Sequence, residues 1–448
     1  MNQETKLPIA IVGAGPVGLA AAAHLTERDL PFVVLETSNV VAASFASVAH
    51  VRLFSPWRMN LDAAAVRLLE RTGWKPPVAE LLPTAGEMRS QYLEPLSKLF
   101  TDRIQFDARV VAITRRGYDK VKTPGRENAP FVVRVRNGSV EREIRAHAII
   151  DASGTWATPN WLGASGVPAL GELEHSRRIA YGMPDVLGAD RERYANKRVL
   201  VLGAGHSAAG NLIGLSQLAL QANKTQVIWA VRSESIARTL GGGANDGLAA
   251  RGQLGTTLRE LVMSGKITLQ LGFGVDAVTE RDGKLEVWSG SSQALSDLDE
   301  IIVSTGSRPD WTAARELRLR LDPWLESTDL LAPLIDPNVH SCGSVPPHGH
   351  RELAHPEVGY YAVGAKSYGR APNFLLATGY EQVRSVVAAI AGDLAAADNV
   401  QLELPETGVC STDFVDHGGG HCTLPQANES AACGTSTGAG KASRGCCG

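Results

Sequence analysis

The feature that most constrains this chain is a strand that runs directly into a glycine-rich turn. Four apolar residues, Ile9–Val12, precede Gly13, Gly15 and Gly18, and Pro16 opens an alanine-rich helical pattern. In a turn with this spacing the first glycine allows a tight bend and the second lets the backbone approach a pyrophosphate. The third glycine lets the helix pack closely on the strand. The helix N-terminus then presents free N–H groups to the phosphates.

A second strand pattern, Phe32–Leu35, follows the helix and ends at Glu36. A carboxylate at this position binds the hydroxyl groups of an unphosphorylated ribose, as in FAD. A glycine-rich turn without a ligand is the alternative. Strand, turn, helix, strand and acid in this order favour a dinucleotide site, because context is what confirms such a motif.

The same pattern restarts near residue 198. The stretch Arg198–Leu202 leads into Gly203 and Gly205, Ser207 follows, and Ala208 stands where a third glycine is usual. A small residue suffices there, because the position only has to let helix and strand pack closely. Two such turns predict two dinucleotides, a tightly held flavin and a diffusible nicotinamide that reduces it.

Two arginines follow the second strand of this second unit. Arg232 comes directly after the strand pattern Gln226–Val231, and Arg238 lies soon after it. Two guanidinium groups match a ribose 2′-phosphate, so NADPH is expected rather than NADH. The alternative is a solvated basic edge, since arginines are common on protein surfaces.

Each unit continues with alternating antiparallel strand patterns and ends in a strand followed by a Ser/Thr and glycine turn, which includes Gly154 in the first unit. The expected fold class is α/β, with two Rossmann-like, three-layer ββα domains, the NADPH domain being inserted in the FAD domain. We expect the FAD-binding domain at residues 1–160 and 320–400, the NADPH-binding domain at 161–319, and a disordered, cysteine-rich tail at 401–448.

The last candidate cofactor-binding residues lie in the part of the chain that precedes the tail. Strand patterns at 339–342 and 359–363 precede Gly364, and a helical pattern is expected over 373–390. The helix opening near Asn373 is expected to point its positive N-terminus at the flavin pyrimidine and to stabilise an anionic reduced flavin. Further helices are expected at 62–71, 86–100 and 256–264.

The chain also resembles a known family. The two turns, with the motifs Asp151–Pro159 (DASGTWATP) and Ser304–Asp310 (STGSRPD), are similar to those of FAD- and NAD(P)H-dependent flavoproteins with two dinucleotide-binding domains. Over residues 8–395 the chain is most similar to the flavin-containing (group B) monooxygenase-like branch. The resemblance implies FAD and NADPH as cofactors, a small-molecule substrate, O2 and a homodimer.

The signature of that branch is present only in part. Gly171 and His175 fit it, whereas Ala169 and Ile179 stand where aromatic residues are usual. The stretch 355–384 is similar to flavoproteins that are often associated with metal and metalloid resistance.

Composition gives no support for several classes of partner. The 448 residues carry a formal net charge of −3, which gives no reason to expect nucleic acid or an anionic membrane as a partner. No apolar run reaches the length that spans a bilayer. The N-terminal residues lack the basic and apolar regions of a secretory signal, so a cytoplasmic location is expected.

Side chains able to hydrogen-bond a peroxide are the catalytic candidates: Asn60, His348, His350 and His355. With the walls Phe54, Pro56 and Trp57, they would form the dry pocket that oxygen activation at a flavin needs. The alternative is that the histidines sit on an exposed loop and only Trp57 is packed, since no spacing here is diagnostic.

Five of the six cysteines lie in the last 39 residues: Cys410, Cys422, Cys433, Cys446 and Cys447. Paired thiols bind soft metal ions and trivalent metalloids, so the tail is a candidate metal(loid) site. The spacings do not match a zinc finger. A low-complexity extension with incidental thiols is the alternative. Because the body has only Cys342, a thioredoxin reductase-like relay there is not expected.

The sequence leaves three hypotheses for the function. The first is an NADPH-dependent FAD monooxygenase that oxidises a soft heteroatom (sulfur, nitrogen or a trivalent metalloid) through a C4a-hydroperoxyflavin. The second is an NADPH-dependent flavoprotein reductase of a metal(loid) or disulfide delivered by the tail cysteines. The third is a non-catalytic, metal-binding or redox-sensing flavoprotein.

Overall fold

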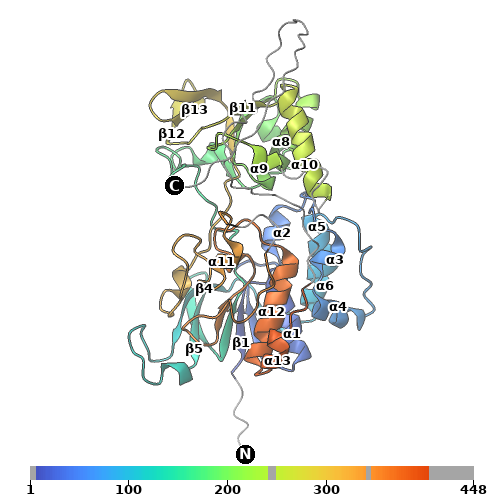
Figure 1. Ribbon diagram of the computed structural model, residues 1–448, viewed down its shortest axis with the longest axis vertical. Coiled ribbons are helices and arrows are strands. Elements are labelled where there is room, and N and C mark those ends of the chain that lie inside the picture. The colour runs from blue at the N-terminus through green and yellow to red at the C-terminus, as the bar shows by residue number, and fades with distance from the viewer. Residues whose placement is uncertain (1–6, 241–248, 340–344, 403–448) are drawn as a thin grey trace, which may run out of the picture. The chain divides into compact units, whose positions relative to one another are not determined.

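The computed structural model of the chain describes residues 7–240, 249–339 and 345–402. These residues form two five-stranded parallel sheets and two three-stranded antiparallel meanders (Figure 1). Each sheet is the centre of one lobe. The first lobe contains the first glycine turn, and the second lobe contains the second.

The sheet of the first lobe has the order β16-β7-β1-β2-β3. Its strands are β1 (Ile9–Val12), β2 (Phe32–Leu35), β3 (Ile104–Gln105), β7 (Ala148–Asp151) and β16 (Tyr360–Ala362). The final residues of three neighbouring strands are in register, because Val12 pairs with both Leu35 and Asp151. The carboxyl ends therefore meet at one edge, where open α/β sheets bind their ligands.

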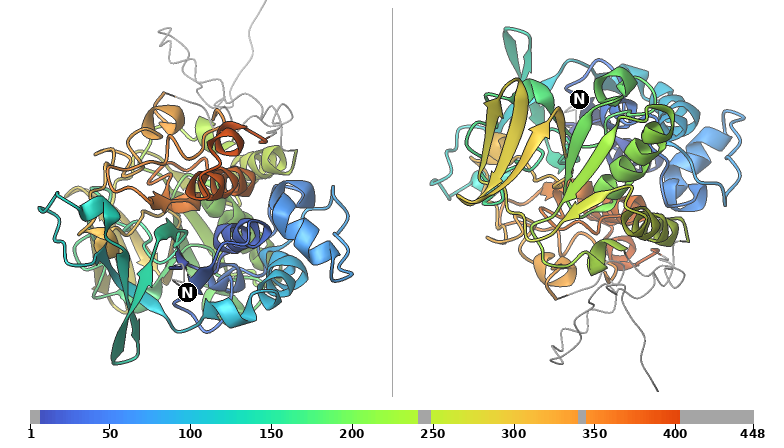
Figure 2. Two further views of the ribbon diagram at one scale, coloured as in Figure 1. Left: turned by 90° about the horizontal axis from the view of Figure 1, so that it is seen from below. Right: turned by 90° about the horizontal axis from the view of Figure 1, so that it is seen from above.

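Alternate residues of β1 face two different layers. Ile9 and Ile11 pack against α1 (Pro16–Glu27) and α12 (Leu376–Ile390). Ala10 and Val12 pack against the meander β4 (Arg109–Arg115), β5 (Phe131–Asn137) and β6 (Val140–Ala146). Figure 2 shows the blue α1 and the red α12 on one side of this sheet and the teal meander on the other. The result is the expected three-layer ββα architecture.

The second lobe repeats this plan with the order β11-β10-β9-β15-β8. Its strands are β8 (Ile179–Tyr181), β9 (Arg198–Leu202), β10 (Gln226–Ala230), β11 (Thr268–Gln270) and β15 (Glu300–Val303). The helices α8 (His206–Gln221) and α10 (Ala249–Met263) cover one face. The meander β12 (Ala277–Arg281), β13 (Lys284–Ser289) and β14 (Gln293–Leu298) covers the other.

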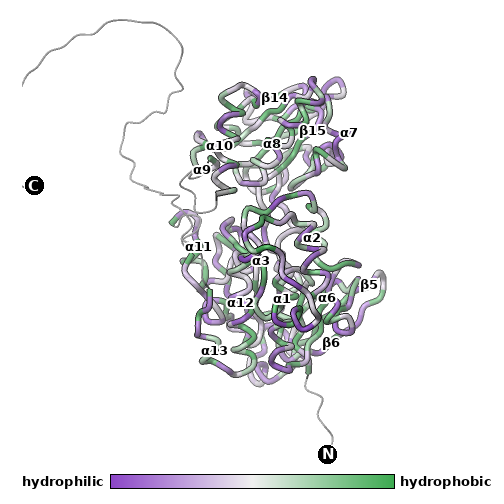
Figure 3. Tube along the Cα trace, turned by 90° about the vertical axis from the view of Figure 1, so that its right-hand side faces the viewer, coloured by the Kyte–Doolittle hydropathy of each residue, from purple (hydrophilic) through white to green (hydrophobic). Residues whose placement is uncertain are grey.

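Shorter helices fill the connections: α2 (Ala43–Ser47), α3 (Trp57–Asn60), α4 (Ala63–Glu70), α5 (Ala85–Met88), α6 (Glu94–Lys98), α7 (Arg191–Tyr194), α9 (Ala237–Leu240), α11 (Ala332–Ile335) and α13 (Leu394–Asp398). Hydrophobic and hydrophilic positions are interspersed along the trace in Figure 3, as expected for elements with one buried face. No described helix is long and apolar enough to cross a bilayer.

The fold class is confirmed, and four local boundaries differ from expectation. The helix expected at 256–264 begins earlier, since α10 spans Ala249–Met263. The helix expected at 86–100 contains a π-helical turn at Arg89–Leu93, because Pro95 has no N–H to donate to the Gln91 carbonyl. That carbonyl accepts the Trp74 Nε1–H instead, at 2.9 Å. The helix expected from residue 373 begins at Leu376. Val339 lies in a turn, and residues 340–342 of the strand expected there are outside the described residues.

The two motifs that carried the family resemblance pair with each other. Pro159 and Ser307 form an isolated antiparallel bridge. On either side of it, Asn160 N–H donates to the Gly306 carbonyl at 2.9 Å and Arg308 N–H to the Thr158 carbonyl at 3.0 Å. These segments connect β7 to the second lobe and β15 to the residues that return to β16. The expected domain boundaries stay a prediction.

Candidate cofactor and active site

The first glycine turn joins β1 to α1, and its glycines meet three different surroundings. A Cβ on Gly13 would lie 2.8 Å from the Ala152 carbonyl oxygen, and its φ of +97° disfavours side chains. A Cβ on Gly18 would overlap the Gly13 carbonyl oxygen. Gly15 has no described neighbour within 4 Å of the same position. Two glycines therefore close the turn, and Gly15 leaves an open face above the backbone.

This open face is lined by unused hydrogen-bond donors. Among the described residues, no acceptor receives the N–H groups of Gly15, Val17 and Gly18. Pro16, at the first helical position, has no N–H to satisfy. The positive end of α1 adds to these donors. The turn therefore fits a pyrophosphate, which supplies acceptors and negative charge at the same point.

Glu36 is buried at the end of β2 and is held by backbone donors. Its Oε2 accepts the Ala14 N–H at 2.7 Å, and its Oε1 accepts the Ser38 N–H at 2.8 Å. These bonds fix the carboxylate beside the first glycine turn. Because each oxygen can accept more than one hydrogen bond, both keep capacity for ribose hydroxyls. This arrangement fits the role predicted for Glu36.

A buried ion pair that sequence reasoning missed lies at the end of β7. Lys366 Nζ donates to Asp151 Oδ2 at 2.7 Å and to Ser153 Oγ at 3.0 Å. The Tyr360 hydroxyl also donates to Asp151 Oδ2, at 2.8 Å. Burial opposes ionisation of Asp151, but the Lys366 ammonium and these hydrogen bonds outweigh it and lower the pKa of the carboxyl. The cluster fixes the turn that contains Gly154.

Gly154 and Gly364 border the same sheet edge. Gly154 has a φ of +69° and no described neighbour within 4 Å of its Cβ position, so its backbone is open to a ligand. A Cβ on Gly364 would lie 3.2 Å from Val17 Cγ2. The Gly364 N–H donates to Gln382 Oε1 of α12 at 2.7 Å. Strand β16 is thereby tied to α12 and to the first turn of α1.

The second glycine turn, between β9 and α8, repeats the first. A Cβ on Gly203, whose φ is +130°, would overlap the Ser304 carbonyl oxygen, while Gly205 has no described neighbour within 4 Å. The Trp229 Nε1–H donates to the Gly203 carbonyl at 2.8 Å and holds the turn from β10. In the described part of the chain, the N–H groups of Gly205 and Ser207 donate to no acceptor. This turn also fits a pyrophosphate.

The two arginines expected at a 2′-phosphate lie just beyond β10. Arg232 is exposed, as a residue that meets a diffusible nucleotide has to be. Arg238 belongs to α9, and its side chain is outside the described residues. Their predicted role in choosing NADPH stays a prediction.

Asn60 is buried at the end of α3, and the hydrogen bonds of its side chain are local. Its Nδ2 donates to the carbonyls of Ser55 and Pro56 at 2.8 and 2.9 Å, and its Oδ1 accepts the Ser55 hydroxyl at 2.9 Å. These three bonds use both amide hydrogens and the amide oxygen. They close the loop at 55–60, which favours a structural role over the predicted catalytic one.

His348 joins two segments in the interior. Its Nε2 accepts from the Gln382 Nε2–H at 2.9 Å, so its proton lies on Nδ1, which donates to the Pro346 carbonyl at 3.0 Å. Burial lowers the pKa of this imidazole. His348 is therefore a neutral ring with both nitrogens engaged, and no proton is free for chemistry.

The side chains of the other two histidines have hydrogen-bond partners different from those of His348. His350 Nε2 lies 2.9 Å from Asp398 Oδ1, which also accepts from Arg351 Nε at 2.7 Å in a partly exposed cluster. His355 Nδ1 accepts the Arg320 N–H at 3.2 Å, and burial lowers its pKa to about 4. Each of the four catalytic candidates thus has its own side-chain partners, and their catalytic roles stay a prediction.

A small apolar hollow lies beside the first glycine turn. It measures about 110 Å³ and is lined by Ser44, Phe45, Val48, Val51, Leu53, Ala85 and Trp156. Its loop is anchored to the turn, because the Ala42 N–H donates to the Ala14 carbonyl at 3.0 Å. Of the expected walls, Pro56 and Trp57 are buried, and the half-buried Phe54 ring lies 5.3 Å from the His206 ring at the start of α8.

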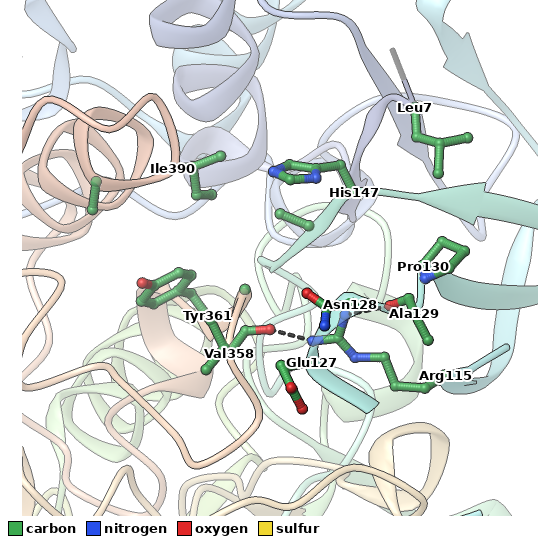
Figure 4. A pocket seen from close by; sticks show the side chains of 13 residues that line it. Leu7, Arg115, Glu127, Asn128, Ala129, Pro130, His147, Val358, Tyr361 and Ile390 are labelled. Carbon is green, nitrogen blue, oxygen red and sulfur yellow. Dashed lines mark hydrogen bonds between the residues drawn. The ribbon is translucent and has the colours of Figure 1, made fainter. Parts of the chain in front are cut away.

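A larger cavity of about 450 Å³ lies at the opposite edge of the first sheet (Figure 4). Leu7, His147 and Gly359, which line it, precede β1, β7 and β16, so the cavity is at the amino ends of the strands. Arg115 on its wall is anchored by Glu357 Oε1 at 2.8 Å and by the Ala129 carbonyl at 2.7 Å. Dinucleotides bind at the carboxyl ends, so this cavity is separate from the cofactor site.

All six cysteines lie outside the described residues, and with them the candidate metal ligands Cys410, Cys422, Cys433, Cys446 and Cys447. Within 7–240, 249–339 and 345–402, no group of three or more His, Cys, Asp or Glu residues could hold a metal ion. The tail metal(loid) site, the homodimer and the cytoplasmic location stay predictions.

Comparison with known proteins gives one family match and several distant relatives. A family model described as pyridine nucleotide-disulphide oxidoreductase matches residues 10–328. Indole-3-pyruvate monooxygenase YUCCA1 of Oryza sativa subsp. japonica is 31% identical over 209 residues, which cover 46% of this chain and 44% of that protein. The chain thus spans less than half the length of this curated relative.

Two solved structures have a similar fold. Bacillithiol disulfide reductase Bdr (YpdA) from Bacillus cereus has a TM-score of 0.64 at 17% identity and covers 87% of this chain and 99% of its own. The FAD-bound cadaverine monooxygenase DfoA from Erwinia amylovora has a TM-score of 0.60 at 14% identity, and the match covers 91% of this chain and 98% of the DfoA chain. At these identities the likeness shows the fold alone.

Proposed function

Because the chain belongs to the pyridine nucleotide-disulphide oxidoreductase family, we propose that it is an NADPH-dependent FAD monooxygenase that oxidises a soft heteroatom. Family membership makes it an oxidoreductase, with FAD and NADPH as its cofactors. The observation that supports a monooxygenase is the pair of open glycine turns, combined with a sequence that has no Cys-x-x-Cys pair to relay electrons to a disulfide.

The residues of the first lobe would hold FAD at the carboxyl edge of its sheet. The free N–H groups of Gly15, Val17 and Gly18 would receive the pyrophosphate, and Glu36 would accept the ribose hydroxyls. The free N–H groups of Gly205 and Ser207 in the second turn would receive the pyrophosphate of NADPH. A bound FAD would supply the redox chemistry, in which NADPH provides the two electrons for the activation of O2, one oxygen atom going to the substrate and the other to water.

The apolar hollow beside the first turn favours an uncharged substrate. None of its seven lining residues carries a charge, and Phe45 and Trp156 supply aromatic walls. Trp156 is about half exposed in the ligand-free chain, so a bound substrate would have to complete the water-excluding enclosure that oxygen activation at a flavin needs. A thioether, an amine in its neutral form or a neutral trivalent metalloid fits these walls better than a charged oxyanion.

Rapid mixing with oxygen tests the proposal. The protein is reduced with NADPH without oxygen, mixed with aerated buffer and followed by its absorbance. We expect a long-lived absorbance that belongs to neither oxidised nor reduced flavin, and whose decay a thioether accelerates. Immediate, featureless return of the oxidised spectrum would contradict a monooxygenase.

A second candidate is a reductase of a metal(loid) or disulfide bound by the tail. The adjacent pair Cys446 and Cys447 favours it, because paired thiols bind soft metal(loid)s. The double variant Cys446→Ser, Cys447→Ser separates the candidates: a reductase loses its activity, whereas a monooxygenase keeps its oxygen-dependent NADPH consumption. Tight metal binding without any NADPH oxidation by the wild type would instead indicate a non-catalytic flavoprotein.

A further inference from the structure

The cavity of about 450 Å³ at the amino ends of β1, β7 and β16 has the size of a small-molecule site (Figure 4). Its walls come from segments far apart in the chain: the residue before β1, the end of β4, the loop before β5, the starts of β7 and β16, and the end of α12. Dinucleotides bind at the opposite edge of such a sheet. FAD and NADPH therefore do not account for this cavity.

A buried guanidinium group forms part of the cavity wall. The Arg115 side chain lines the cavity although it is only 4% exposed. Its Nε, Nη1 and Nη2 each donate one hydrogen bond, to the Glu357 carboxylate and to the carbonyls of Ala129 and Val358. A guanidinium group has five N–H hydrogens, so two remain for which the described residues provide no acceptor. The Phe131 ring, whose centre lies 3.6 Å from the guanidinium carbon, holds the plane of the group in place.

The buried charges around Arg115 do not balance. The Glu357 carboxylate pairs with both Arg115 and Arg126, at 2.8 Å each, and all three side chains are less than 5% exposed. Within the described ranges, neither arginine has a second carboxylate partner. Buried charges are normally paired, and here one positive charge is in excess. The carboxylates of the nearby loop, Asp119 and Glu127, are exposed, so solvent screens them.

Three further side chains on the cavity wall carry hydrogen-bond donors: Asn128, His147 and Tyr361. In the part of the chain that the structure describes, none of these side chains has a hydrogen-bond partner. An amide N–H, an imidazole N–H and a phenol O–H can each donate to a negatively charged oxygen. Figure 4 shows these side chains and Arg115 around the same space. The wall therefore offers several donors to an acceptor that the protein itself does not supply.

We propose that this cavity is a second ligand site, which binds a small aliphatic carboxylate with its anionic head on Arg115. One excess positive charge matches a singly charged anion, and the two carboxylate oxygens match the two unused guanidinium N–H hydrogens. Leu7, Val358 and Ile390 supply apolar walls for an aliphatic chain. This site is additional to the proposed function and does not depend on the reaction at the cofactor edge.

Calorimetric titration of the purified full-length protein with hexanoate, hexylamine and acetate tests the chemistry of the ligand. Hexanoate should bind at least about tenfold more tightly than hexylamine, because only the carboxylate forms charge-assisted hydrogen bonds with Arg115. Acetate should bind more weakly than hexanoate, because it leaves the apolar walls uncovered. Equal affinities for hexanoate and hexylamine, equal affinities for hexanoate and acetate, or no detectable binding of hexanoate would overturn the proposal.

Two substitutions of exposed residues test the place of binding without disturbing the core. Asn128→Asp adds a negative charge to the cavity wall, so the affinity for hexanoate should fall about fivefold, whereas Glu127→Gln removes one and should raise it about twofold. The matched control is Asn137→Asp, the same change at an exposed position of β5 that does not line the cavity. The control should keep the wild-type affinity. Unchanged hexanoate binding in Asn128→Asp would place the ligand elsewhere and overturn the proposal.

Arg115→Lys tests the anionic head directly. Lysine keeps a positive charge beside Glu357 but loses the planar guanidinium group, so the affinity for hexanoate should fall about tenfold. A folded Arg115→Lys protein with wild-type affinity would contradict the assignment. Asn128→Asp decides the question if Arg115→Lys does not fold. Because these measurements are equilibrium binding at the amino edge of the sheet, a failure of the oxygen reaction would contradict the proposed function alone.

Discussion

The substitution Gly15→Ala should weaken FAD binding while leaving the fold intact. Gly15 has φ −79° and ψ −176°, which alanine adopts without strain, and its Cβ would have no described neighbour within 4 Å. The expected loss of unfolding free energy is below about 1 kcal/mol, the cost of alanine at a helix N-cap. The new methyl group would instead occupy the face where the pyrophosphate approaches.

The loss of FAD affinity follows from the donors on that face. Displacing the pyrophosphate weakens at least one charge-assisted hydrogen bond, worth about 2–3 kcal/mol, so the FAD dissociation constant should rise about 30- to 150-fold. Gly18→Ala should behave differently. Its Cβ would overlap the backbone of Gly13, and such overpacking costs about 1–3 kcal/mol of stability.

Flavin titration and urea unfolding of the flavin-free chain measure the two effects separately. Gly205→Ala is the matched control, because it makes the same change on an equally open face of the second turn. It should weaken NADPH binding and leave FAD binding unchanged. Wild-type FAD affinity in Gly15→Ala, or loss of FAD in Gly205→Ala, would refute the assignment of the two turns.

Two further predictions concern buried titratable groups. The Glu357 carboxylate accepts hydrogen bonds from Arg115 Nε and Arg126 Nη2, both at 2.8 Å, and from the Arg318 N–H at 3.0 Å. Glu357→Gln should therefore lower the free energy of unfolding in urea by about 3 kcal/mol and leave the flavin spectrum unchanged. A loss below about 1 kcal/mol would contradict this. Burial lowers the pKa of His355 from 6.5 to about 4, so the folded state resists a proton that the unfolded state binds. The free energy of unfolding should therefore fall by about 3 kcal/mol as pH drops from 6.5 to 4. If the urea midpoint of a His355→Gln variant falls with pH as steeply as that of the wild type, His355 is not the group responsible.

The glycine turns could be predicted from sequence because their requirements are local. Gly13, Gly15 and Gly18 lie within six residues, and each position is decided by the strand and helix that it joins. Glu36 was predictable for the same reason, since it ends the next strand. Residue spacing along the chain is enough to place all four at one edge.

The rest of the site depends on contacts between distant residues. Lys366 and Asp151 are 215 residues apart, and neither belongs to a motif that indicates the other. The three histidines are close in sequence, yet the ring of each contacts a different hydrogen-bond partner, which for His350 is Asp398. Asn373 was predicted from its place near a helix start, but only the structure shows that its side-chain amide has no partner among the described residues.

The motif Gly171 with His175 shows how a signature can be present for structural reasons. A Cβ on Gly171, whose φ is +78°, would overlap the Val278 carbonyl oxygen of the meander in the second lobe. Next to it, the buried Glu172 carboxylate accepts the Leu162 and Ala169 N–H groups at 2.8 and 2.7 Å. This part of the signature closes a loop, which gives it a structural role.

Strand β16 completes the first sheet, yet it follows its neighbour β7 in the chain by about 200 residues; the Tyr360–Asp151 bond spans 209. At about 5–20 residues per second, a ribosome needs roughly 10–40 s to make this stretch. During that interval the nascent first lobe has four strands and lacks α12, so β7 is an uncovered edge with apolar residues such as Ile149 and Ile150. An exposed edge strand is a template for pairing with other chains, so this edge is open to mispairing until β16 and α12 have been made.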